Sequence, residues 1–259
     1  MVGRAGRRAV VAGIAVAVIA LTLYAVVQYE LPHGEPPTPN VAGAGKALIA
    51  DSLGIDFPNS KLLSRVTSIL KDAGFKVDVV MGRDVNMSLY ERLTNYQVVL
   101  LRIHGGKASY VTASGEVKII NGLFTGVPWS DEFEELKKEW LGTRARPYHN
   151  PNEAYLALLP KFFLEKLSGY FPPNSTVVVA SCYSLITPDI AKSMGAHGLR
   201  YFVGWEGPVT VEHMDKAVVK LFEYRFEEGL SWPEAVEEVN NELGPDPLKN
   251  EYLRIVSFK

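Results

Sequence analysis

The chain has 259 residues, of which 47% are hydrophobic and 22% are charged. This length and composition suffice to bury the core of one globular domain of about 200 residues. A formal net charge of −2 gives no general attraction to phosphate backbones, and a single cysteine excludes an intrachain disulfide and every multi-cysteine metal site. We therefore expect no nucleic-acid partner, no metal and no cofactor.

The N-terminus has the pattern of a membrane anchor. Three arginines within the first eight residues precede nineteen uncharged residues from Ala9 to Val27. Such a run forms a helix of about 28 Å, close to the thickness of the bilayer hydrocarbon. The basic flank should stay in the cytoplasm. A cleaved signal peptide is the alternative, although no A-x-A cleavage pattern follows Val27.

This pattern predicts three parts of the chain. Residues 1–28 form the cytoplasmic flank and the anchor, residues 29–45 form a proline-rich tether, and residues 46–259 form one domain. The protein is then expected in the cell membrane as a single-pass protein, with its domain outside the cytoplasm.

From Lys46 onward, short apolar runs alternate with amphipathic ones, which is typical of a mainly parallel sheet covered by helices. Strands are predicted at Lys46 to Asp51, Phe75 to Met81, Val98 to Ile103, Thr176 to Ser181 and Arg200 to Trp205. Helices are predicted at Ser60 to Ala73, Ser88 to Asn95, Asp131 to Trp140, Leu156 to Ser168, Pro188 to Met194, Val211 to Glu228 and Trp232 to Leu243. A hairpin turning at Ser114 and Gly115 is predicted in the long insertion between the third and fourth strands.

Two of the predicted strands end at residues that can do chemistry. The run "VVLLRIHGG" ends at His104, Gly105 and Gly106, and "VVVASCYSL" contains Cys182. Catalytic groups gather at the carboxyl edge of an open α/β sheet, and a cysteine nucleophile needs a nearby base. Glycine N–H groups after the histidine can stabilise an oxyanion. The alternative is that Cys182 is a buried core thiol and His104 a strand-end histidine, and that the two do not act together in catalysis.

These two motifs resemble those of the caspase-like cysteine peptidases, a family that includes caspases, legumains, gingipains, separases and CHAT proteases. The segment after Cys182, with its "GLRYFVGWEGPVTVEHM" run, is most similar to CHAT domains. The resemblance implies a caspase/hemoglobinase-like three-layer α/β sandwich with a mainly parallel central sheet, behind one transmembrane helix. It also implies His104 as general base and acid, Cys182 as nucleophile, and an oxyanion hole from the N–H groups of Gly105 and Cys182. The caspase "QAC" motif is absent, and Ala180 stands where metacaspases place an aspartate.

Four further residues are candidates for substrate binding. Asp51 and Glu206 follow predicted strands at the same edge, where either carboxylate can pair with a basic side chain. Tyr183 and Trp205 can wall the pocket. A helix cap or loop hydrogen bond is the alternative for the acids, and a core position is the alternative for Trp205.

The remaining histidines, at positions 33, 149, 197 and 213, are expected at the surface. A papain-like enzyme requires its histidine after the cysteine, and that order fits this sequence less well.

The sequence thus predicts a membrane-anchored cysteine endopeptidase that cleaves a polypeptide after basic residues through a thioester. A transpeptidase of the same fold, or an inactive caspase-like binding module, remains an alternative.

Overall fold

The computed structural model describes residues 45–112 and 114–259. The predicted anchor at residues 1–28 and the predicted tether, apart from its last residue, lie outside these ranges. Among the described residues, no helix is both long enough and apolar enough to cross a membrane.

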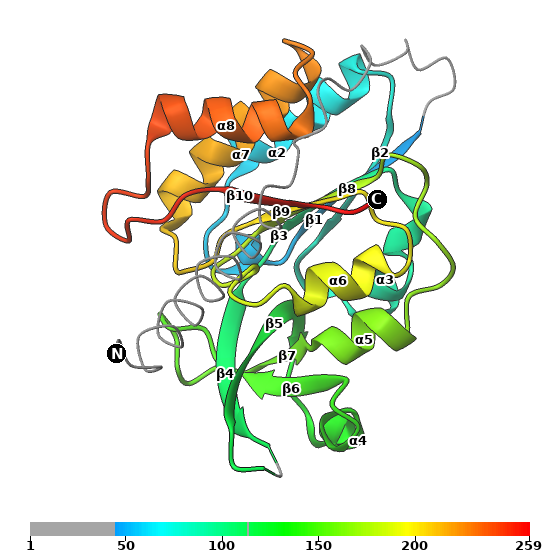
Figure 1. The fold of residues 1–259 in the computed structure, drawn as a ribbon, viewed down its shortest axis with the longest axis vertical. Helices are drawn as coiled ribbons and strands as arrows, with labels where there is room; N and C mark the ends of the chain where they lie inside the picture. Colours follow the sequence, from blue (N-terminus) through cyan, green and yellow to red (C-terminus); the bar gives the residue numbers. More distant parts are fainter. Residues whose placement is uncertain (1–44, 113) are drawn as a thin grey trace, which may run out of the picture. The chain divides into compact units, whose positions relative to one another are not determined.

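The larger sheet, sheet A, contains all five strands predicted from the apolar runs (Figure 1). Its spatial order is β10-β9-β8-β3-β1-β2, and every neighbouring pair is parallel except β10 with β9. The strands are β1 (Lys46–Asp51), β2 (Lys76–Met81), β3 (Val98–Arg102), β8 (Thr176–Ala180), β9 (Tyr201–Gly204) and β10 (Arg254–Ser257). Because β3 and β8 are buried at every residue, their sequences are continuous apolar runs rather than alternating ones.

Helices cover both faces of sheet A (Figure 1). On one face, side chains of sheet A share a core cluster with α2 (Ser60–Asp72), α7 (Val211–Phe226) and α8 (Trp232–Leu243). On the other face, the cluster includes α3 (Met87–Glu91), α5 (Pro160–Glu165) and α6 (Asp189–Gly195). A capping box begins α8, since Ser231 and Glu234 cap each other's backbone N–H groups.

A second sheet, sheet B, is built from the insertion between β3 and β8. It is wholly antiparallel in the order β4-β5-β7-β6, with β4 (Gly105–Val111), β5 (Val117–Pro128), β6 (Gly142–Ala145) and β7 (Tyr155–Leu158). The predicted hairpin is confirmed as β4 and β5, with Gly115 at a φ of +83° in the turn. The short helix α4 (Glu134–Lys138) and four 3-10 helices, η1 (Leu53–Ile55), η2 (Gly82–Asp84), η3 (Leu93–Asn95) and η4 (Asp131–Phe133), complete the described elements.

The predicted fold class, a caspase/hemoglobinase-like three-layer sandwich behind a transmembrane helix, is wrong. The described chain is a mixed α/β fold in which mainly parallel sheet A is joined by antiparallel sheet B, and the described residues contain no membrane-spanning helix. The insertion misled the prediction because Tyr155–Leu158 is buried throughout and shows no strand-like alternation. Residues 156–158 were assigned to the start of a helix, whereas the helix begins only at Pro160.

Candidate active site

The ends of β3 and β8 bring His104 and Cys182 to the same edge and face of sheet A. The two strands are parallel neighbours whose last pair is Arg102 with Ala180, so His104 and Cys182 each follow two residues later. Side chains alternate along a strand, and Leu100 and Ala180 lie in the core cluster on the α7 side. Cys182 packs against the same cluster, and His104 lies beside Phe57, which also packs against that cluster.

Gly105 directly contacts the turn that carries Cys182. A methyl group on Gly105 would collide with the carbonyl oxygen of Cys182 and lie 2.6 Å from the hydroxyl of Ser181. This close approach explains why glycine follows the histidine. The backbone N–H of Phe124 donates to the carbonyl of His104. Hydrogen-bonded and non-bonded pairs alternate in an antiparallel ladder, so the N–H of Gly105 points away from β5.

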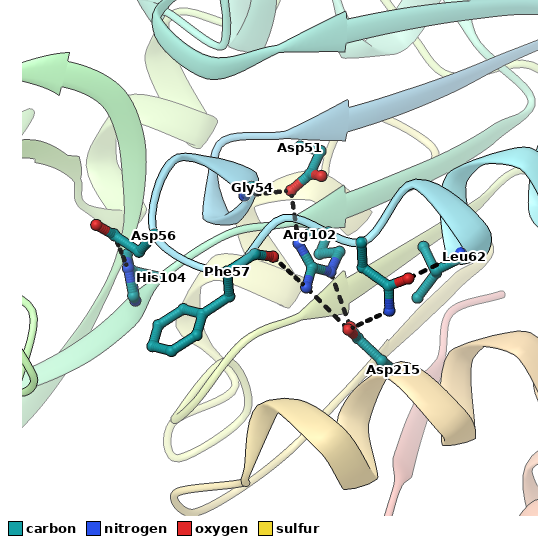
Figure 2. A network of polar contacts seen from close by, with 9 residues as sticks. Asp51, Gly54, Asp56, Phe57, Leu62, Arg102, His104 and Asp215 are labelled. Atoms are coloured by element: carbon teal, nitrogen blue, oxygen red, sulfur yellow. Dashed lines mark hydrogen bonds and ion pairs between the residues drawn. The ribbon is translucent and has the colours of Figure 1, made fainter.

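The imidazole of His104 is held by Asp56, a residue that sequence reasoning missed. The Nε2 atom of His104 lies 2.8 Å from Oδ2 of Asp56, in the loop after η1 (Figure 2). Burial lowers the pKa of His104, and the carboxylate of Asp56 opposes that shift. An ionised Asp56 accepts the proton of Nε2, which leaves Nδ1 of His104 as the basic nitrogen.

His149 joins this pair from the loop between β6 and β7. Its Nε2 atom lies 3.4 Å from Oδ1 of Asp56, and its ring stacks on that of His104 with centroids 5.1 Å apart. Phe57 packs edge-on against His149 at 4.9 Å. His149 is at the surface, as expected from the sequence, with a side chain 34% exposed, but it contacts both Asp56 and His104.

The thiol of Cys182 is half-buried beneath the loop that follows β9. Its sulfur accepts a hydrogen bond from the N–H of Val209 at 3.4 Å and lies 3.5 Å from the Val209 carbonyl. Burial raises the pKa of Cys182, and the N–H of Val209 partly offsets the shift. The next residue, Tyr183, has a left-handed φ of +58° and donates its N–H to the carbonyl of Gly207. The turn after Cys182 is thus held in a strained conformation by the neighbouring loop.

The four candidate substrate-binding residues fall into two groups. Asp51 and Trp205 are buried, at 1% and 0% exposure, and Asp51 pairs with Arg102. Neither side chain is accessible to a substrate, which corrects the expectation for both. Glu206 is 59% exposed and precedes the Gly207 carbonyl that Tyr183 contacts. Glu206 and Tyr183 therefore remain beside the cysteine turn.

A buried ionic network lies next to the pair of Asp56 and His104 (Figure 2). The guanidinium of Arg102 donates from Nε and Nη2 to the two carboxylate oxygens of Asp215, each at 2.8 Å, and from Nη1 to Asp51 at 3.0 Å. It also donates to the carbonyl of Phe57 at 2.9 Å. Asn59, the N-cap of α2, adds a hydrogen bond to Asp215.

This network fixes the loop that carries Asp56. Arg102 binds the loop at both ends, through the carboxylate of Asp51 and the carbonyl of Phe57. Burial raises the pKa of Asp51 despite the nearby guanidinium. His104 lies two residues after Arg102 on the same chain segment. The network therefore holds the segment that carries His104 against the loop that carries Asp56, which keeps the two side chains within hydrogen-bond distance.

Comparison of the chain with family models and curated proteins identified no relative. No family model matches the chain, and no curated protein matches it. The resemblance to caspase-like peptidases thus rests on the two strand-end motifs and the segment after Cys182.

Proposed function

We propose that the protein is a cysteine endopeptidase in which Cys182 is the nucleophile and His104 the general base and acid. The observation that carries the proposal is the register of β3 and β8. It brings the two residues to one face of one sheet edge, two positions beyond the pair Arg102 and Ala180. The motif resemblance to caspase-like cysteine peptidases supports the same chemistry.

The reaction follows from the protonation states of the two groups. Burial keeps the pKa of Cys182 above its usual value, so the thiol is neutral near pH 7 and needs a base during attack. Burial also lowers the pKa of His104, which favours the neutral imidazole that can accept this proton. The sulfur then bonds to the peptide carbonyl carbon, His104 returns the proton to the leaving amine, and water hydrolyses the thioester.

The backbone supplies the oxyanion site in this proposal. The N–H of Gly105 points away from β5, and Gly105 contacts the Cys182 turn. Together with the N–H of Cys182, it provides two donors for the oxygen of the tetrahedral intermediate. Such donors contribute about 10²-fold or more to acyl-transfer rates.

We further propose that the substrate residue before the cut is basic. Glu206 is the exposed acid beside Tyr183, and its ion pair with Arg254 spans 3.9 Å between two exposed side chains, so a substrate cation can compete for it. Asp51 is excluded because it is buried and Arg102 occupies it. A second acid, Glu251, contacts Gly207 in the same loop. Two carboxylates beside the cysteine turn favour Arg or Lys over apolar side chains.

The proposal is tested with the purified full chain and a panel of peptidyl acyloxymethyl ketones. An arginine-containing reagent should form a thioether with Cys182, located by peptide mass spectrometry, and peptide hydrolysis should disappear in Cys182→Ser. Ser184→Ala, which changes a buried hydroxyl in the same turn, is the matched control and should keep the labelling. Hydrolysis at an unchanged rate in Cys182→Ser would overturn the proposal, as would a thiol that no reagent of the panel labels.

A further inference from the structure

Two histidines and one aspartate converge from three distant segments. Asp56 follows β1, His104 follows β3, and His149 lies between β6 and β7. Each offers one ligand atom, and these atoms lie within 4.8 Å of one another. The proposed peptidase chemistry needs His104 and uses Asp56 to orient it, but it gives no role to His149.

The spacing of the ligand atoms matches a small divalent cation. Bonds of about 2.0–2.1 Å in tetrahedral geometry place ligand atoms roughly 3.3 Å apart. Nε2 of His104 lies 2.8 Å from Oδ2 of Asp56, and Nε2 of His149 lies 3.4 Å from Oδ1 of the same carboxylate. One ligand atom from each residue lies within 4.8 Å of the other two, so small side-chain rotations reach that spacing. We propose that Asp56, His104 and His149 bind one divalent transition-metal ion, with Zn²⁺ as the best fit, and leave one coordination position open to solvent.

The donor set and its surroundings favour this class of ion. Two imidazoles and a carboxylate are ligands that zinc accepts, whereas Mg²⁺ and Ca²⁺ prefer oxygen alone. The rings of Phe57 and Phe124 flank His104, with centroids 6.3 and 5.9 Å away, so the site has an apolar wall. Arg102 places a positive charge close enough to act on His104, but Asp51 and Asp215 both pair with Arg102 and offset that repulsion.

Metal binding and the peptidase reaction would compete for His104. A cation bound to Nε2 of His104 replaces the hydrogen bond from that nitrogen to Asp56 and fixes the ring on the metal. Zn²⁺ is therefore expected to inhibit Cys182 chemistry reversibly. His149 separates the two roles, since it is needed for the cation and not for the dyad.

Direct binding is measured on the full chain without a polyhistidine tag. Titration with Co²⁺, followed by its d–d absorption, should show one ion per chain with tetrahedral intensity, and Zn²⁺ should displace it. His149→Ala and Asp56→Asn should each weaken the affinity about tenfold or more. His197→Ala, which changes a histidine bound to backbone carbonyls elsewhere, and Cys182→Ser should both retain it. Absence of one-to-one binding, or equal affinity in His149→Ala, would overturn the proposal.

A second readout keeps this proposal separate from the peptidase proposal. Zn²⁺ should slow ketone labelling of Cys182 in the unaltered chain, a chelator should restore it, and His149→Ala should be labelled normally but lose the zinc effect. If Cys182 proves inert while Co²⁺ binding still depends on His149, the metal site stands and the peptidase fails. If labelling occurs but His149→Ala leaves zinc sensitivity unchanged, the metal site fails and the peptidase stands.

Discussion

Arg102 and His104 lie two residues apart at the end of β3, and each binds a carboxylate from the segment between Asp51 and Phe57. Arg102 is 1% exposed and is fully engaged by Asp51, Asp215 and a backbone carbonyl. The side chain of His104 is 19% exposed and binds Asp56 through one ring nitrogen only. The same local architecture thus produces a structural ion network and, beside it, a group with a nitrogen left for chemistry.

The difference lies in how completely each charge is compensated. A buried guanidinium is stable only when its charge is paired and its N–H groups are hydrogen-bonded. Removing one member of such a pair leaves an uncompensated charge in the protein interior, which is strongly destabilising. Asp56 is partly exposed and shared between two histidines, so its loss exposes no isolated buried charge. Substitutions on the two sides of the loop should therefore affect different measurements.

The largest effect is expected from Arg102→Leu. This change leaves Asp51 and Asp215 buried together without their cation, and it should lower the free energy of unfolding by about 3–5 kcal/mol. Urea denaturation followed by circular dichroism measures the loss. The matched control is Arg65→Leu, whose guanidinium also binds two carboxylates but is 41% exposed and should cost about 1 kcal/mol or less. Equal losses in the two variants would contradict the contrast between buried and exposed networks.

Asp56→Asn should affect activity rather than stability. Asparagine keeps the shape but not the charge that orients His104, so hydrolysis of a peptide substrate should slow by about 10–100-fold, with the melting temperature almost unchanged. Asp56→Glu should restore part of the rate, and Asp84→Asn, at an exposed acid, should have no effect. A melting temperature that falls in parallel with activity would assign Asp56 to the structural side of the comparison. Chelator is added throughout to exclude metal effects.

The pH dependence of thiol reactivity tests the environment of Cys182. Because burial raises the pKa of Cys182, the thiolate fraction increases about tenfold per pH unit as the pH rises toward that pKa. Alkylation by iodoacetamide in His104→Ala should therefore keep rising between pH 7 and pH 9. A rate that stays constant from pH 6 to pH 8 would show a preformed thiolate, contrary to the half-buried neutral thiol described above.

The smallest effect is expected from Glu206→Gln. Removing this exposed charge should lower the ratio of arginine to leucine cleavage by about fivefold, equivalent to about 1 kcal/mol, because solvent and the neighbouring Arg254 weaken the attraction between Glu206 and a substrate arginine. Glu212→Gln, an 82% exposed acid on α7, is the control. An unchanged ratio would remove Glu206 from the pocket without affecting the dyad.

The sequence predicted the parts of the fold that depend on short apolar runs. All five strands of the parallel region were found within about one residue at each end, and their carboxyl ends placed His104 and Cys182 at one edge. In sheet B the hairpin of β4 and β5 was predicted, but β6 and β7 were missed. The four residues of β7 are all buried, so their sequence is equally consistent with a helix.

The partners of His104 were missed for a different reason. Asp56 and His149 lie 48 and 45 residues away along the chain, in loops whose sequences carry no periodic signal. Their meeting depends on the Arg102 network and on how the insertion folds back, which are tertiary contacts. Asp51 was misjudged because a carboxylate after a strand serves equally well as a ligand or as a buried counter-ion.

The central claim, that His104 and Cys182 act together, is tested most directly by the rate of ketone labelling at Cys182 in the unaltered chain and in His104→Ala. Both are measured at pH 7 with chelator present, and His213→Ala serves as a histidine control. The account predicts that His104→Ala is labelled about 10²–10⁴-fold more slowly while its melting temperature is retained. Equal labelling rates in the two proteins would contradict the dyad and leave Cys182 as a buried thiol of the core.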